Sequence, residues 1–229
     1  YLNGEKTMSH GVTEFGLFMH KIMEKYFKKE LKLEDMKQYF EDNLWKNIHS
    51  PTILNMSADF SKDMYSTYKD GFEKYLEEFK GVASLVSLDD VKAVEEYFEF
   101  LVDTRYMING IIDLAFEDYE GNLIICDHKS KNKFKSKKEC KEYARQLYLY
   151  AYAWNDMYGK YPKRLMFNMM RGKPVIIEFS EEDMNEALQW VDNIVREIEN
   201  TMVFEPNPDT FFCSNWCGLV RDELGEPLI

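Results

Sequence analysis

The sequence predicts an α/β fold whose elements follow in the order αβββαββα. Two short apolar segments rich in β-branched residues lie on either side of a polar turn at 118–122, which indicates an antiparallel hairpin. Three more apolar segments predict further strands, and apolar residues at helical spacing predict the helices. Outside the hairpin, the predicted elements are helices at 14–29, 136–158 and from 180 onward, and strands at 94–102, 165–170 and 175–179.

The first predicted helix has one broad apolar stripe. The stripe consists of Phe15, Phe18, Met19, Ile22, Met23, Tyr26 and Phe27. His20 falls at the border of the stripe, one turn from Gly16 and from Glu24, where a histidine is most often a half-buried structural residue. Gly16 costs helix stability, which indicates close approach by the sheet or by a substrate. Glu24 either orients the imidazole or faces water.

Residues 30–92 predict a helical insertion that packs over the core. Helical spacing covers 33–48 and 61–79, and Pro51 with its polar neighbours separates the two stretches. The aromatic and methionine side chains of the second stretch share one face, which is typical of core packing. His10 and His49 have no partner at ligand spacing, so we assign them no function.

The register of the predicted hairpin brings charged residues together. With the turn near residue 120, Asp113 lies opposite Asp127. Opposed residues of an antiparallel pair project to the same face, and so do residues two apart on one strand. Asp113, Asp127 and Lys129 are therefore expected on one side of the sheet, with Cys126 and His128 on the other.

Two opposed carboxylates indicate a metal site. Like charges that face each other on a sheet are destabilising unless a cation neutralises them. Carboxylates are hard oxygen ligands that suit Mg²⁺ or Mn²⁺, and a lysine beside them can orient a nucleophile or stabilise developing charge. These are the groups needed to hydrolyse a phosphodiester. The alternative is a solvated hairpin end, but both acids interrupt strongly apolar runs.

The amino-acid composition argues against several other classes of protein. The chain has 229 residues and can bury a sizeable core. It contains no apolar run long enough for a membrane span and no secretory signal, and its four cysteines do not suggest a disulfide scaffold, so we expect a cytoplasmic protein. The net charge of −12 argues against a protein that coats nucleic acid. A Lys-rich stretch at 129–138 could still hold a phosphate backbone locally, or it is a solvated loop.

The ordered series of these residues resembles the motifs of the PD-(D/E)XK nuclease superfamily. The series is Gly16-x-x-x-His20, Gly110-x-x-Asp113, Asp127-x-Lys129 and Gln146-x-x-x-Tyr150. It is most similar to the RecB-like branch, which includes the nuclease domains of the RecB and AddB recombination enzymes, the CRISPR-associated exonucleases and phage exonucleases. The resemblance extends from the first residues to the cysteines near the end, apart from the segment at about 30–92.

The resemblance implies a restriction-endonuclease-like fold, in which helices flank a central mixed sheet. It implies one nuclease domain over 1–229, with 30–92 inserted into it, and a metal-dependent deoxyribonuclease that acts on DNA ends in recombination, repair, phage or defence processing. The implied catalytic residues are Asp113, Asp127 and Lys129. The implied ligands of Mg²⁺ or Mn²⁺ are His20, Asp113, Asp127 and the backbone carbonyl of His128. The expected DNA contacts are Gln146, Tyr150 and Lys131.

The cysteines depart from the pattern of many RecB-like relatives, which carry one cysteine before the histidine helix and three near the C-terminus. This chain has Cys126, Cys140, Cys213 and Cys217, so only two lie in the tail. An iron–sulfur cluster normally needs four thiolates. We therefore expect no cluster, although an upstream cysteine would lie outside a sequence that starts at Tyr1.

Two other functions remain open. A nuclease-like fold can serve as a non-catalytic nucleic-acid-binding or scaffold module, although such a module has no need for a costly carboxylate pair. Cleavage of RNA or another phosphodiester also fits the same residues. The expected partner is DNA, as ends or single strands, with no membrane; a homo-oligomer or a recombination protein is a further candidate partner.

Overall fold

The computed structural model describes residues 11–48, 58–78, 85–102 and 105–203. Its centre is a five-stranded mixed sheet in the order β1-β2-β3-β4-β5. Strands β3 and β4 are parallel, and the other neighbouring pairs are antiparallel. The strands are β1 (Val91–Val102), β2 (Tyr106–Glu117), β3 (Leu123–Lys129), β4 (Arg164–Met169) and β5 (Val175–Glu178).

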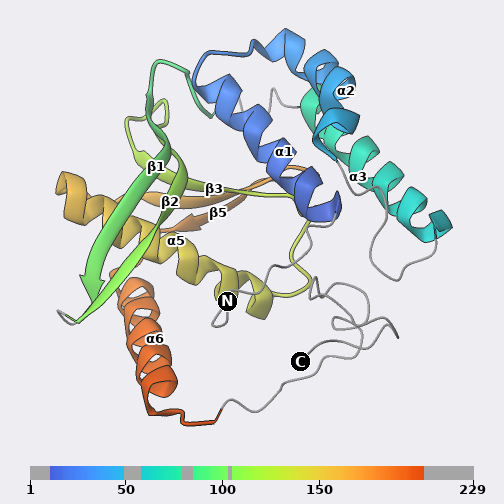
Figure 1. Cartoon of the computed structure of the whole chain (residues 1–229). Coiled ribbons are helices and arrows are strands. Elements are labelled where there is room, and N and C mark those ends of the chain that lie inside the picture. The colour runs from blue at the N-terminus through green and yellow to red at the C-terminus, as the bar shows by residue number, and fades with distance from the viewer. Residues whose placement is uncertain (1–10, 49–57, 79–84, 103–104, 204–229) are drawn as a thin grey trace.

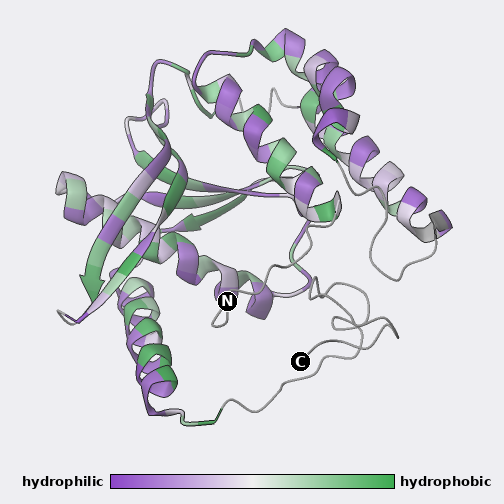
Figure 2. Ribbon diagram, viewed as in Figure 1, coloured by the Kyte–Doolittle hydropathy of each residue, from purple (hydrophilic) through white to green (hydrophobic). Residues whose placement is uncertain are grey.

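Helices cover both faces of the sheet (Figure 1). On one face lie α1 (Gly11–Phe27), the short 3₁₀ helix η1 (Leu33–Asp35), α2 (Met36–Asn47) and α3 (Ala58–Glu78). On the other lie α5 (Lys137–Tyr158) and α6 (Glu181–Asn200). Figure 2 shows hydrophobic and hydrophilic residues alternating in bands along α1, as expected for a helix with one buried face.

Two separate cores hold these layers together. One joins α1, α2 and α3 to the side of the sheet that carries Leu114, Ile124 and Cys126. The other joins α5 and α6 to the opposite side, which carries Ile125 and Phe167. A crossover from β3 through α5 to the parallel strand β4 therefore places α5 across the sheet from α1.

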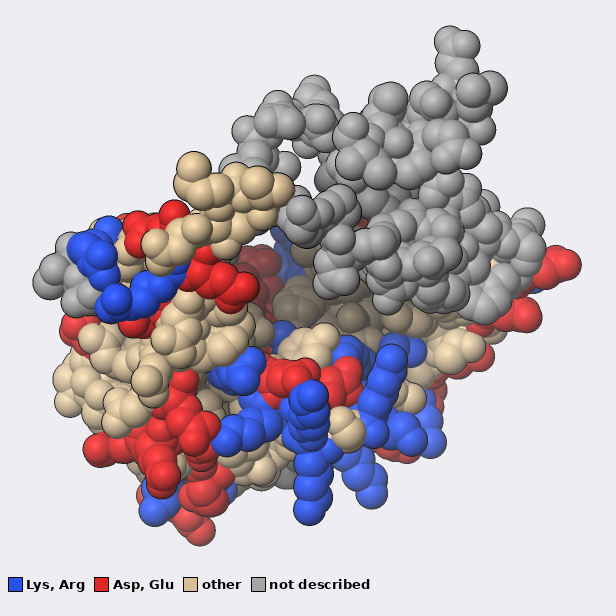
Figure 3. Space-filling view, turned by 90° about the horizontal axis from the view of Figure 1, so that it is seen from below, with Lys and Arg blue, Asp and Glu red and all other residues tan. Residues whose placement is uncertain are grey.

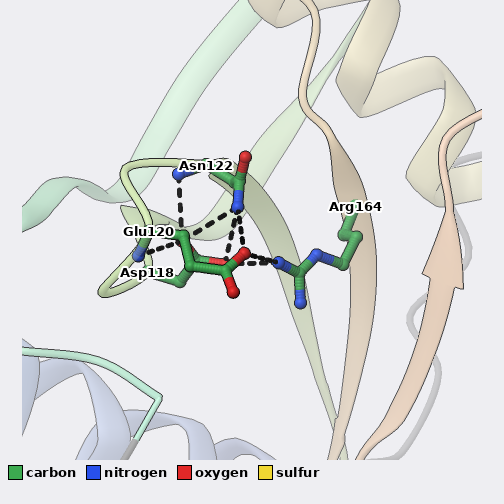
Figure 4. A network of polar contacts seen from close by, with 4 residues as sticks. All are labelled: Asp118, Glu120, Asn122 and Arg164. Atoms are coloured by element: carbon green, nitrogen blue, oxygen red, sulfur yellow. Dashed lines mark hydrogen bonds and ion pairs between the residues drawn. The ribbon is translucent and has the colours of Figure 1, made fainter.

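The turn between β2 and β3 sets the register of the hairpin. Asp118 Oδ1 accepts hydrogen bonds from the backbone N–H groups of Glu120 and Asn122, both at 2.9 Å, and Gly121 takes the left-handed conformation with φ 77°. Arg164, at the start of β4, donates through Nη2 to Asp118 Oδ2 at 2.6 Å (Figure 4). This network connects the turn to the neighbouring strand.

The register that results agrees with the sequence. Leu114 pairs with Cys126, as expected for a turn near residue 120. The next residues toward the far end of the hairpin are Asp113 and Asp127, so the two acids lie on adjacent strands just beyond this pair.

The β1–β2 pair bends sharply at the site of these acids. Val94 pairs with Leu114 and Glu96 pairs with Ile112, which leaves Glu95 opposite Asp113. Glu95 has φ 54°, a left-handed conformation that is rare for a residue with a Cβ. Ile112 packs in the core with α5, whereas Leu114, two residues later, packs in the core with α1. The two faces of β2 therefore exchange sides of the sheet between these residues. The residues at the bend lie between the two layers of helices.

The predicted fold class and element order are confirmed. The αβββαββα core is α1, β1–β3, α5, β4–β5 and α6, and α2 and α3 fall in the segment read as an insertion. Boundaries differ slightly, because β1 begins three residues before the predicted start and α1 begins at Gly11. In the part of the chain that the structure describes, we find no helix with the length and apolar character that a membrane span requires. Cys213, Cys217, His10, His49 and Pro51 lie outside the described residues.

Candidate active site

Ionisable side chains from two strands, β2 and β3, and one helix, α1, meet at the bend of the sheet. Asp127 is buried, with 2% of its surface exposed, and its Oδ2 lies 2.8 Å from Lys129 Nζ. Asp113 is also buried, and its Oδ2 accepts a 2.7 Å hydrogen bond from the backbone N–H of His128. His20 of α1 places Nδ1 3.5 Å from the same Asp113 oxygen. The structure thus brings these predicted residues together.

Burial makes the carboxylates of this cluster hard to ionise. It raises the pKa of Asp113 to about 6, against the opposing effects of the His128 N–H and of Lys129. Burial likewise raises the pKa of Asp127 to about 6, with Asp113 adding to the rise and Lys129 opposing it. Burial lowers the pKa of His20, which favours the neutral imidazole that ligates metals. Perturbed acids of this kind are characteristic of functional sites.

Lys129 is held by a chain of polar contacts from α5. Its Nζ donates to Gln146 Oε1 at 2.8 Å, and Gln146 Nε2 donates to the hydroxyl of Tyr150 at 2.5 Å. The ammonium also lies 5.4 Å from the ring centroid of Tyr143. Gln146 and Tyr150 are one turn apart, and the amide between them accepts from the lysine and donates to the tyrosine. The Gln-x-x-x-Tyr spacing therefore has a clear structural use: it fixes the position of the ammonium.

The α1 side of the site is an open hollow of about 610 Å³, lined by Gly16, His20, Glu24, Glu95 and Ser130 among others. A Cβ built on Gly16 would lie 3.5 Å from the Ser130 hydroxyl oxygen, an ordinary van der Waals distance. The protein itself therefore does not require a glycine here, which favours the substrate as the reason for it. Of the two alternatives for Glu24, the structure supports solvent, because its carboxylate pairs with Lys28 at 2.7 Å and not with His20.

The ring of His128 is a structural group. It is buried on the α1 side, stacks on Phe27 and accepts at Nδ1 from the Asn168 side-chain amide, 3.0 Å away. Asn168 Oδ1 in turn accepts from the hydroxyl of Tyr75 in α3. Burial lowers the pKa of His128 well below its ordinary value, so the ring is neutral. The ring is therefore used in packing, and the metal contact expected of the His128 backbone carbonyl stays a prediction.

Glu95 is a site residue that the sequence reasoning missed. Oxygen and nitrogen atoms of His20, Glu95 and Asp113 all lie within 4.8 Å of one another. Burial raises the pKa of Glu95 to about 7, and the charges of Asp113 and Glu24 add to the rise. In the sequence this glutamate is one of two consecutive acids in a strand, with no local signal for the left-handed conformation that Glu95 adopts.

A divalent cation fits this set of donors. Asp127 Oδ2 is buried, and within the described residues no donor meets it in hydrogen-bond geometry, despite its ion pair with Lys129. Donor atoms of His20, Glu95 and Asp113 form one cluster, and Asp127 lies beside it, paired with Lys129. Buried charges need pairing or a metal, and the carboxylates of this set are ligands that suit Mg²⁺ or Mn²⁺.

The remaining predicted contact, Lys131, lies two residues beyond Lys129. Its ammonium forms an ion pair with Glu139 at 2.7 Å and lies 4.2 Å from the ring centroid of Tyr143. Glu139 therefore already neutralises part of the charge that would attract a phosphate. The rest of the Lys-rich stretch leads into α5. Figure 3 shows basic side chains gathered on the face seen from below, where α5 begins.

The sequence matches the family model of the PD-(D/E)XK nuclease superfamily over residues 2–221. Fold, site and match agree, and the chain belongs to this superfamily.

Among solved structures, the chain is similar to a protein from Eubacterium rectale that carries a provisional exonuclease assignment. The identity is 15%, the TM-score is 0.43, and the match covers 90% of this chain and 81% of the other. It is also similar to SSO0001, with 14% identity, a TM-score of 0.36 and coverage of 91% and 90%. No curated protein matches the chain significantly.

Proposed function

We propose that this protein is a metal-dependent deoxyribonuclease of the RecB-like type, and that it cleaves phosphodiesters by direct attack of water. His20, Asp113, Asp127 and the backbone carbonyl of His128 would hold Mg²⁺ or Mn²⁺, and Glu95 adds a further carboxylate at the same place. The bound ion would lower the pKa of water and neutralise a non-bridging phosphate oxygen.

Lys129 would orient the attacking water or stabilise the developing charge. Gln146 and Asp127 both contact its ammonium, so it needs little reorganisation when a phosphate arrives. Tyr150 and Gln146 lie beside the carboxylates and can contact the scissile strand. The face with the gathered lysines would receive the DNA backbone, while the acidic remainder of the protein disfavours general coating of DNA.

One observation carries this proposal above the others. Of two buried carboxylates on adjacent strands, Asp127 is paired with Lys129 and Asp113 lies beside His20, and burial raises the pKa of both acids. A scaffold module would gain nothing from such a cluster, because buried acids cost stability unless a cation compensates them.

The proposal is tested with end-labelled linear DNA and closed circular DNA of the same sequence, each incubated with Mg²⁺ or Mn²⁺. We expect degradation of the linear form alone, because the resemblance favours attack at ends. Cleavage of the circle would replace the exonuclease by an endonuclease. Intact DNA of both forms under all metal conditions would leave the non-catalytic module as the better description.

A further inference from the structure

A second hollow adjoins the candidate site on the α5 side. It has a volume of about 480 Å³, within the range of about 300–1,000 Å³ typical of small-molecule sites. It is bounded by the β1–β2 hairpin, α5 and the first half of α6 (Figure 1). Gln146 and Tyr150 line it as well, so the hollow begins at the residues that position Lys129.

The chemistry of this hollow suits a nucleotide. Trp190 of α6 lines the hollow and is 39% exposed, so part of its ring is accessible from solvent. The guanidinium of Arg145 lies over its ring, 4.8 Å from the centroid. Within the described residues, no carboxylate forms an ion pair with Arg145, although the protein carries a net charge of −12. Aromatic rings and arginine planes are the two surfaces on which unpaired bases stack, and a free guanidinium can also meet a phosphate.

The sheet keeps this hollow open. A Cβ on Gly110 would come within 2.8 Å of the Phe98 ring, so the glycine allows that ring to approach β2, and both residues line the hollow. Asn109 and Glu142 at the edge offer groups that can hydrogen-bond to a base.

We propose that this hollow binds a base of a single-stranded DNA substrate, next to the phosphate that is cleaved, with Trp190 and Arg145 as the stacking surface. A base can enter only when it is unpaired and unstacked, so the hollow makes the enzyme prefer single-stranded ends to blunt duplex ends. This inference rests on the proposed function for the identity of the strand, and it adds the choice of substrate.

Binding of a fluorescent oligothymidylate in EDTA tests the inference without any cleavage. The Trp190→Leu variant keeps an apolar side chain but removes the stacking surface, and we expect roughly tenfold weaker binding, the loss typical of one stacked base. Trp190→Phe should bind within about threefold of the wild type, because a smaller aromatic ring still stacks. Arg145→Ala should weaken binding and reduce its dependence on salt by about one phosphate contact.

Three comparisons decide the outcome. Asn185→Ala, an exposed residue of α6 outside the hollow, should bind like the wild type. A blunt hairpin duplex should lose little affinity with Trp190→Leu. Equal oligothymidylate affinity in wild type and Trp190→Leu would overturn the inference, as would an equal loss for the blunt duplex. If the wild type binds as expected but cleaves no DNA with metal, the proposed function fails while the binding site stands.

Discussion

At the scale of single residues, the site depends on three acids held close to His20 or to Lys129. Asp113, Asp127 and Glu95 each have a pKa raised by burial, to about 6, 6 and 7. Because these values lie above those of an unfolded chain, the contribution of the three groups to stability is full at low pH and is lost as the pH rises through about 6 to 7. A cation that binds their ionised forms would restore it.

This gives a first prediction. The rise in Tm caused by Mn²⁺ should be large at about pH 8 and small at about pH 5, where protons occupy the carboxylates. Differential scanning fluorimetry with and without Mn²⁺ measures it. A rise of the same size at both pH values would contradict the assignment of the cation to these acids.

Glu95 supplies a second prediction. Glu95→Gln keeps the shape of the side chain but removes one charge next to His20 and Asp113, so the affinity for Mn²⁺ should fall roughly tenfold or more. Isothermal titration calorimetry measures the affinity. Glu99→Gln, on the exposed side of the same strand, is the matched control and should leave it unchanged. An unaltered affinity in Glu95→Gln would place this residue outside the metal site.

The sequence predicted part of this site for physical reasons. A turn centred near residue 120 determines which residues oppose each other, so the closeness of Asp113 and Asp127 follows from local signals alone. Glu95 could not be found in that way. Its inward position depends on a left-handed residue in the middle of a strand, and neither Glu95 nor its neighbours are residues that favour this conformation.

At the scale of elements, β2 carries a packing requirement at Gly110 and a proposed catalytic residue, Asp113, three positions later. Gly110→Ala would place a methyl group about 2.8 Å from the Phe98 ring, which forces the two strands or the ring to shift. We expect a loss of about 1–3 kcal/mol, or a Tm lower by about 3–10 °C. Thermal unfolding measures it, and Phe98→Leu in the same chain should recover much of the loss.

Gly16→Ala is the informative contrast, because a methyl group there meets only ordinary contacts and alanine favours a helix by about 1 kcal/mol. Its Tm should stay equal or rise. Destabilisation by Gly16→Ala equal to that of Gly110→Ala would mean that the helix and sheet are closer than described.

The helices and strands themselves could be predicted from the periodicity of apolar residues, and the predicted boundaries lie within a few residues of the observed ones. Ser136 and Ser180 accept hydrogen bonds from the backbone three residues on, so helix starts were readable from capping residues. Sheet order was less accessible. The parallel pairing of β3 with β4 joins segments about 40 residues apart across α5, and no local pattern specifies it.

At the scale of the whole molecule, Arg171 connects the helical layer to the loop that follows Lys129. Its Nε donates to the carbonyl of Ser130 at 2.7 Å, and its guanidinium lies 3.6 Å from the ring centroid of Tyr68 in α3. The next residue, Gly172, lies so close to Asn132 that a Cβ would be 2.0 Å from its carbonyl oxygen. Through Arg171, the segment read as an insertion thus contacts the loop that follows β3.

Arg171→Lys should therefore lower the cleavage rate, because lysine keeps the charge but loses the planar stacking and the directed hydrogen bond. We expect a fall of roughly ten- to a hundredfold in single-turnover rate, the cost of a small displacement of a catalytic group. Lys173→Ala, exposed in the same turn, is the control. Wild-type rates in Arg171→Lys would show that Lys129 keeps its position without this link.

The most direct measurement is cleavage of end-labelled linear DNA in Mn²⁺ by the wild type and by Asp127→Ala. We predict that the wild type degrades the DNA, whereas Asp127→Ala leaves it intact while retaining a cooperative thermal transition. Degradation by a folded Asp127→Ala protein would contradict the assignment of the chemistry to the buried acids of β2 and β3.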